Sequence, residues 1–132
     1  MVEVTTTWLK DNDFKAEVSG NVVAMSANYD NGASPKQLLL AGLAGCTGID
    51  VCDMLKKMRV TFAQFQIIVI ANQTLEHPKI YDYIKITYKF VGNNIDLQKV
   101  EKAVKLSKEK YCGVSAMLAK SAKIEYEIII TQ

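Results

Sequence analysis

The stretch LLLAGLAGCTGIDVC (residues 38–52) places a cysteine inside an apolar run that is rich in glycine. Gly42, Gly45 and Gly48 each cost a helix roughly 1 kcal/mol relative to alanine, so such a run needs a reason. Either another segment approaches this helix closely, or Cys46 is present for its thiol chemistry. A buried cysteine that acts only as a small hydrophobe is the alternative. The small neighbours of Cys46 favour chemistry, because they leave space for a small substrate.

Two further cysteines have different settings. Cys112 lies in LSKEKYCGV (residues 106–114), where one helix is expected to end and a short one to begin. A helix N-terminus gives a thiol thiolate character, although a packing role at the cap is equally open. Cys52 follows Cys46 by six residues, about 240° around a helix, and is expected in the core. An odd cysteine count in a reducing compartment argues against structural disulfides and leaves a transient pairing open.

Other catalytic groups are scarce. The only histidine, His77, precedes a proline at an expected hairpin tip, and no CxxC pair is present, so no metal site is expected. No glycine-rich phosphate loop occurs, which disfavours nucleotide binding. Asp50 and Asp53 have the spacing of a solvated helix surface, which favours that role over paired acid–base catalysis.

Composition excludes several classes of partner. Sixteen basic and fourteen acidic residues leave a net charge of +2, and the two signs are interleaved. Neither nucleic acid nor an anionic membrane surface is therefore indicated. Arg59 is the only arginine, so only one bidentate guanidinium contact is available. The start of the chain does not resemble a signal peptide, and the uninterrupted apolar runs are short, which predicts a cytoplasmic protein that does not span a membrane.

The pattern of elements predicts an α+β protein with a single domain over residues 1–132. Ser34 is a good N-cap and Pro35 suits the first helical position, so a long helix is expected to begin there. Alternating apolar residues predict strands, and apolar residues at helical spacing predict helices. The expected strands are 2–9, 14–18, 22–27, 62–74, 80–90 and 124–130, and the expected helices are 35–58, 96–111 and 115–120.

The first half of the helix 35–58 is apolar on nearly every side, which is more surface than one sheet face covers. Gly42 and Gly45 lie on one stripe of it and permit close approach of another backbone. A second copy of the chain would explain both features. A homodimer with these helices at its centre is therefore expected.

Three segments together resemble the OsmC/Ohr family of small thiol peroxidases. They are SPKQLLLAGLAGCTGIDV (34–51), HPKIYDYIKITYKFVG (77–92) and LSKEKYCGVSAML (106–118), and the resemblance covers most of the chain in the right order. It implies antiparallel β-sheets packed around a long central helix, in an intertwined homodimer with two active sites at the subunit interface. The segments AGCTGIDV and KYCGV are more similar to the OsmC-like branch than to the organic hydroperoxide resistance branch.

The resemblance also implies a mechanism. Cys46 matches the peroxidatic cysteine, which attacks the O–O bond and becomes a sulfenic acid. Cys112 matches the resolving cysteine, which condenses with it into a disulfide. A dihydrolipoyl-type dithiol or a small thiol then restores the reduced form, and no metal or organic cofactor is needed. Apolar surroundings at Cys46 favour small organic hydroperoxides, so a role in oxidative stress defence follows.

One departure from the family concerns activation of the thiol. Better-known members carry a glutamate ten residues before the peroxidatic cysteine, paired with an arginine from the N-terminal strands. This chain has Lys36 at that place and no arginine in those strands, so Lys36 or Lys15 is the candidate that stabilises the thiolate. Tyr111, Glu109 and Asp50 are further candidates for lining the site.

Two other functions remain open from the sequence. The missing Glu–Arg pair favours a dimeric binding or scaffold protein that keeps the fold with little peroxidase activity. A thiol enzyme acting on an acyl or sulfur-transfer electrophile would need Cys46 without Cys112. The presence of both cysteines favours the peroxidase over this last alternative.

Overall fold

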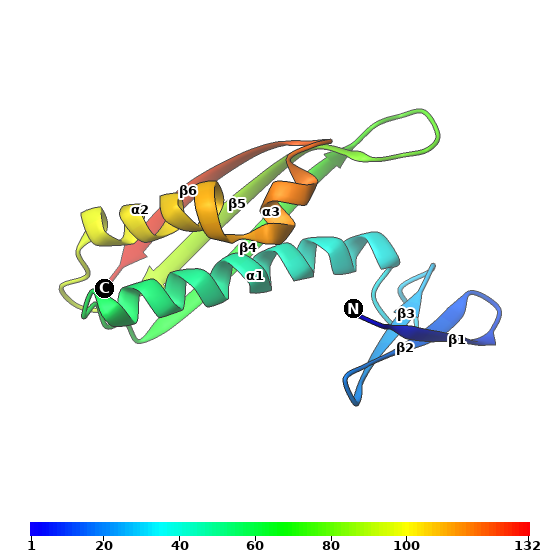
Figure 1. Cartoon of the computed structure of the whole chain (residues 1–132). Coiled ribbons are helices and arrows are strands. Elements are labelled where there is room, and N and C mark those ends of the chain that lie inside the picture. The colour runs from blue at the N-terminus through cyan, green and yellow to red at the C-terminus, as the bar shows by residue number, and fades with distance from the viewer. The chain divides into compact units, whose positions relative to one another are not determined.

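The computed structural model describes all residues 1–132, which form two compact units, Met1–Leu40 and Ala41–Gln132 (Figure 1). The first unit is an antiparallel sheet in the order β1-β2-β3, with β1 Thr5–Lys10, β2 Asp13–Val18 and β3 Asn21–Ser26. Ser19 and Gly20 join β2 to β3 with positive φ angles of 50° and 80°. Two successive positive φ angles make the tight hairpin turn whose twist matches the flanking strands.

Helix α1, Pro35–Lys57, begins in the first unit and continues into the second. The backbone N–H of Gln37 donates to Ser34 Oγ, and the Gln37 side chain accepts from the N–H of Ser34. This reciprocal pair satisfies two donors that a helix start leaves open, which confirms the expected N-cap. The helix ends where Arg59 takes a φ of 60° and the N–H of Val60 returns to the carbonyl of Leu55.

The second unit is a sheet with helices on one face (Figure 1). Its elements after α1 are β4 Gln64–Gln73, β5 Tyr81–Val91, α2 Leu97–Leu106, the π-helical turn η1 Ser107–Tyr111, α3 Gly113–Leu118 and β6 Lys123–Thr131. The sheet order is β4-β5-β6, with β4 antiparallel and β6 parallel to β5. The expected α+β class and long helix are confirmed, but this sheet is mixed rather than antiparallel, because the chain crosses over through α2, η1 and α3 before β6.

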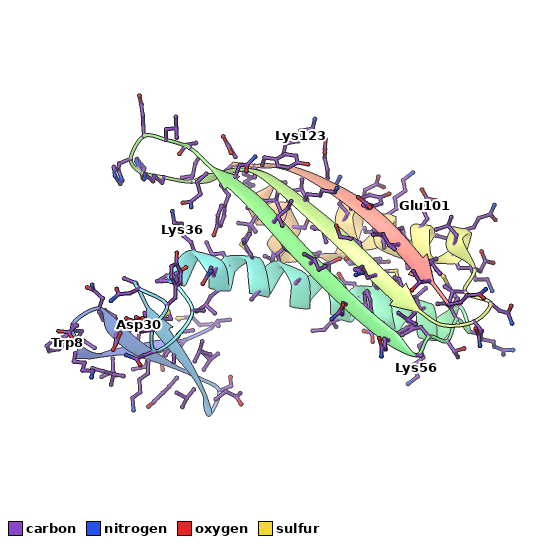
Figure 2. All side chains as sticks on the ribbon, turned by 180° about the vertical axis from the view of Figure 1, so that it is seen from behind. Trp8, Asp30, Lys36, Lys56, Glu101 and Lys123 are labelled. Atoms are coloured by element: carbon purple, nitrogen blue, oxygen red, sulfur yellow. The ribbon has the colours of Figure 1, made fainter.

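The core of the second unit lies between this sheet and its helices. Alternate residues of β5 are buried, as their spacing predicts, and they are Ile84, Ile86, Tyr88 and Phe90. Helix α1 contributes Leu43, Val51 and Leu55, all without exposed surface. Figure 2 shows that the opposite face of the sheet is uncovered. In the same view, Lys123 extends from the edge strand β6 and Glu101 extends from α2.

Much of α1 remains exposed within one chain. Ile49 is 66% exposed, and a Cβ added at Gly42 or Gly45 would meet no atom within 4 Å. Close approach by another segment is therefore absent within the chain at Gly42 and Gly45, whereas a Cβ added at Gly48 would lie 2.9 Å from Ile67 Cδ1. By length and composition α1 is also apolar enough to cross a membrane, a test that core helices of soluble proteins pass as well. The prediction that residues 1–132 form a single domain stays a prediction.

Candidate active site

Two thiols and a carboxylate meet in the second unit. The Sγ atoms of Cys46 and Cys112 and a carboxylate oxygen of Asp50 all lie within 4.8 Å of one another. Cys46 and Asp50 are four residues apart on α1, so they share one face of that helix. The cluster brings together the two cysteines that the sequence singles out, and both thiols are free.

The π-helical turn brings Cys112 to this place. The N–H of Cys112 donates to the carbonyl of Ser107, five residues earlier, at 2.8 Å. The wider turn ends α2 and lets Cys112 cap α3, where its Sγ accepts from the N–H of Ser115 at 3.3 Å. Single π-turns of this kind are frequent at functional sites. Cys112 is 3% exposed, whereas Cys46 is only half-buried.

Burial raises the pKa of the Cys112 thiol to about 11, and a hydrogen bond with Cys46 adds to the rise. The N–H of Ser115 acts in the opposite direction but is outweighed. The expectation that the start of a helix gives Cys112 thiolate character is therefore wrong, because desolvation is the larger effect here. Cys112 is a protonated thiol at neutral pH, which suits a group that reacts second.

A chain of hydrogen bonds ends on Asp50. Ser107 Oγ donates to Asp50 Oδ2 at 2.9 Å, and Thr47 Oγ1 lies 2.9 Å from Ser107 Oγ and 2.7 Å from Tyr88 Oη. A hydroxyl has one proton to donate. Since Ser107 gives its proton to the carboxylate, Thr47 must donate to Ser107 and Tyr88 must donate to Thr47. The order of donors is therefore Tyr88, Thr47, Ser107 and finally Asp50.

The three hydroxyl groups of this chain are buried. Tyr88 and Thr47 are each 1% exposed, and Ser107 has no exposed surface. Burial raises the pKa of Tyr88 to about 12, so its phenol keeps the proton that it donates. Three elements, β5, α1 and η1, are thereby joined at one carboxylate. The interpretation of Asp50 as a solvated surface charge is wrong, because Ser107 donates a part-buried hydrogen bond to it, whereas its role in the site stays a prediction.

A pocket of about 360 Å³ opens beside Asp50. It is lined by Asp50, Asp53, Met54, Lys57, Leu106 and Tyr111. Tyr111, a candidate from the sequence, lines this pocket with Asp50, whereas Cys46 and Cys112 are not among the lining residues. Glu109 is exposed on η1, and no contact connects it with the cysteines. The apolar side chains of Met54 and Leu106 suit an alkyl group, and the carboxylate of Asp50 supplies a polar end.

The other predicted residues lie elsewhere. Lys15 and Lys36 belong to the first unit, where Lys15 Nζ is 3.7 Å from Glu17 on the same strand. Their role in stabilising the Cys46 thiolate stays a prediction. Cys52 is exposed rather than in the core, because its position on α1 turns it away from the buried stripe. It lines a second, apolar groove with Gly45 and Ile49.

The cluster is a weaker fit for a metal ion than for thiol chemistry. Two sulfurs and a carboxylate oxygen are close enough to face one cation. Metal binding needs deprotonated thiols, however, and the raised pKa of Cys112 opposes this. The expectation that the protein uses no metal and no organic cofactor stays a prediction.

Sequence analysis missed the hydroxyl groups that hold Asp50. Thr47 and Ser107 fall at helical spacing among apolar residues, and a polar side chain at such a position signals a buried partner. The alternation along residues 80–90 places Tyr88 on the same face as Ile84, Ile86 and Phe90, which explains burial of its ring but does not reveal the partner of its hydroxyl. The spacing of four residues between Cys46 and Asp50 was the available signal for the carboxylate.

The chain is similar to known proteins in both sequence and structure. Residues 28–127 match the family model OsmC, described as OsmC-like protein. Protein YhfA of Escherichia coli (strain K12) is 30% identical over 132 residues, which cover 97% of this chain and 98% of YhfA. A hypothetical protein of Aquifex aeolicus VF5 has a similar structure, with a TM-score of 0.88 and 34% identity over 100% of this chain and 98% of that chain.

A more distant structure shares the fold alone. The organic hydroperoxide resistance protein OhrB of Bacillus subtilis has a TM-score of 0.66 and 17% identity, over 96% of this chain and 97% of that chain. The family match covers most of the chain and includes both Cys46 and Cys112. The chain therefore belongs to the OsmC-like family.

Proposed function

We propose that this protein is a thiol-dependent peroxidase that reduces small organic hydroperoxides through Cys46 and Cys112. The observation that carries the proposal is the meeting of their two free thiols within 4.8 Å, one half-buried and one buried. Disulfide formation needs the sulfurs to approach to about 2 Å, which side-chain rotation at the start of α3 can supply. The more accessible Cys46 is the thiol that meets substrate.

The reaction balances in three steps. Cys46 attacks the O–O bond of ROOH, giving a Cys46 sulfenic acid and the alcohol ROH, and the thiol proton ends on the alcohol. The Cys112 thiol then attacks the sulfenic sulfur, giving a Cys46–Cys112 disulfide and water. A dithiol of dihydrolipoyl type, or two small thiols, reduces the disulfide and becomes oxidised itself. We place this reaction in the cytoplasm, as part of the defence against oxidative stress.

The site and the family support this proposal. Family membership is consistent with a redox role. The structurally similar OhrB is named as an organic hydroperoxide resistance protein. The pocket beside Asp50 offers apolar side chains for an alkyl group. A smaller inorganic peroxide would leave that apolar surface unused.

The sharpest test is intact mass after one equivalent of cumene hydroperoxide, on wild type, Cys46→Ser and Cys112→Ser. We expect wild type to lose two hydrogens per chain, Cys112→Ser to gain one oxygen, and Cys46→Ser to stay unmodified. A thiol peroxidase of known activity serves as the positive control in the same buffer. Three unmodified proteins beside a reacting control would contradict the proposal and favour a binding protein.

The alternative of a dimeric binding or scaffold protein has one specific observation in its favour. The chain lacks the arginine that its better-known relatives are expected to use for thiol activation. If Lys15 or Lys36 takes the place of that arginine, methionine at either position should slow alkylation of Cys46 by iodoacetamide. If both variants were alkylated at the wild-type rate, neither lysine would act as the cationic activator of the thiol.

We also propose that two copies of the chain form a homodimer through α1. Gly42 and Gly45 have no atom near their missing side chains, although close approach is what glycines on a helix stripe permit. An apolar groove of about 550 Å³ runs between α1 and β4 and includes Gly45, Gly48, Ile49 and Ile67. The apolar surface of α1 that one chain leaves open is what a second α1 would cover.

A leucine at Gly45 tests the dimer. Its side chain would enter open space within one chain, so folding should survive while the partner's approach is blocked. We expect Gly45→Leu to dissociate at concentrations where wild type is dimeric, in analytical ultracentrifugation. Lys102→Leu adds the same side chain on the exposed face of α2 and should leave the mass unchanged. A dimeric Gly45→Leu protein would exclude α1 as the interface.

A further inference from the structure

The proposed peroxidase lacks an obvious carrier for its protons. Each step removes a proton from a thiol and leaves an oxygen that must gain one: the alkoxide of the hydroperoxide, then the hydroxide of the sulfenic acid. The arginine of the better-known relatives is absent from the N-terminal strands. A cationic group would favour a preformed thiolate, whereas the charged group that lies with the two sulfurs here is a carboxylate.

Asp50 is the group placed to serve both thiols. One of its oxygens lies within 4.8 Å of the sulfur of Cys46 and of the sulfur of Cys112. A separation within 4.8 Å allows proton exchange directly or through a single water molecule. The carboxylate also lines the pocket beside the site, so an entering hydroperoxide would lie on its open side.

The hydrogen-bond chain fixes one side of the carboxylate and leaves the other free. Ser107 donates to Oδ2, and the order of donors back to Tyr88 means that no member of the chain needs a proton from Asp50. A carboxylate with one anchored oxygen keeps its second oxygen for proton exchange. Ser107 and Thr47 are therefore positioning residues, which act through Asp50.

We propose, on the basis of the peroxidase function above, that Asp50 carries the proton in both steps. In the first step it accepts the Cys46 proton as sulfur attacks, and it returns that proton to the departing alkoxide, which leaves as alcohol. In the second step it accepts the Cys112 proton as that sulfur attacks the sulfenic acid, and returns it to the departing hydroxide, which leaves as water. The carboxylate is unchanged after each step.

Several titratable and charged groups face Asp50 and affect how its reaction depends on pH. They are Cys46, Asp53 and Lys57 from α1, Tyr88 from β5, Tyr111 from η1, and Cys112. Neutralising Asp50 removes a negative charge beside two thiols. If the carboxylate acted only through its charge, its loss would ease thiolate formation and speed the reaction. Proton transfer predicts the opposite sign.

The test is Asp50→Asn, with Asp50→Glu as the conservative variant and Glu101→Gln as the control for loss of one negative charge. Glu101 is exposed on α2 and lies outside the pocket. In single-turnover mixing with cumene hydroperoxide at pH 7, we expect Asp50→Asn to slow both sulfenic acid formation and disulfide closure by about 10²-fold. Asp50→Glu should recover part of the rate, and Glu101→Gln should match wild type.

The pH profile separates proton transfer from a structural role. In Asp50→Asn the rate should rise about tenfold per pH unit as hydroxide takes over from the carboxylate, whereas wild type should vary less over the same range. A variant that is faster at pH 7, or whose profile is parallel to that of wild type, would overturn the proposal.

A second electrophile keeps this test independent of peroxidase activity. In a Cys52→Ser background, which removes the exposed third thiol, the disulfide 4,4′-dithiodipyridine reacts with Cys46, and Cys112 then expels the second thiopyridone with closure of the Cys46–Cys112 disulfide. Failure of wild type to consume hydroperoxide would remove the proposed function, while this reaction still reports on Asp50. Equal rates of both thiopyridone releases in wild type and Asp50→Asn would overturn the role of Asp50 itself.

Discussion

Replacing Cys46 with serine is expected to abolish hydroperoxide reduction, with a loss of more than about 10³-fold in turnover. The reason is that the remaining site thiol cannot take over. Burial raises the pKa of the Cys112 thiol above its usual value, so this thiol is largely protonated at pH 7. The measurement is consumption of cumene hydroperoxide in the presence of a dithiol such as dihydrolipoamide.

Serine at Cys112 should give a different defect. The first equivalent of hydroperoxide should react as in wild type, because Cys46 and Asp50 are intact. The sulfenic acid then has no resolving partner, and excess hydroperoxide should carry it to the irreversible sulfinic acid. Cys52→Ser is the control for general thiol loss and should behave as wild type. Full turnover by Cys46→Ser, or inactivation of Cys52→Ser, would contradict these roles.

Much of the fold follows from local patterns. The capping pair at Ser34, the alternation along β5 and the helical spacing at Val100 and Val104 each specify an element, and each element is present. Strand direction does not follow from such patterns. The sequence cannot show that β6 is parallel to β5, because this depends on how the connection through α3 returns the chain.

The site could be predicted in part. The thiols are visible because cysteine is rare and each one invites an explanation. The pKa of Cys112 could not be predicted, since the cap contact and burial act in opposite directions and only the packed structure shows that burial is larger. Asp50 was misread as surface because helix spacing alone cannot show that Ser107, 57 residues later, donates to it.

Replacing Thr47 with valine should be the most costly change among the hydroxyls that hold the site. Valine keeps the shape of threonine but can neither accept from Tyr88 nor donate to Ser107. The buried phenol then lacks an acceptor, and each unsatisfied buried polar group costs about 1–3 kcal/mol. We expect the free energy of unfolding to fall by about 2–4 kcal/mol, measured by urea titration at one protein concentration.

A double-mutant cycle shows whether the missing hydrogen bond is the cause. Tyr88→Phe removes the donor that Thr47→Val leaves without a partner, so the double variant should lose less stability than the sum of the two single variants. A coupling of about 1–2 kcal/mol is expected for groups in direct contact. Thr47→Ser keeps the hydroxyl and should be close to wild type. If Thr47→Val were as stable as wild type, the hydroxyl of Thr47 would not stabilise the fold, and Asp50 would have to be held in place by Ser107 alone.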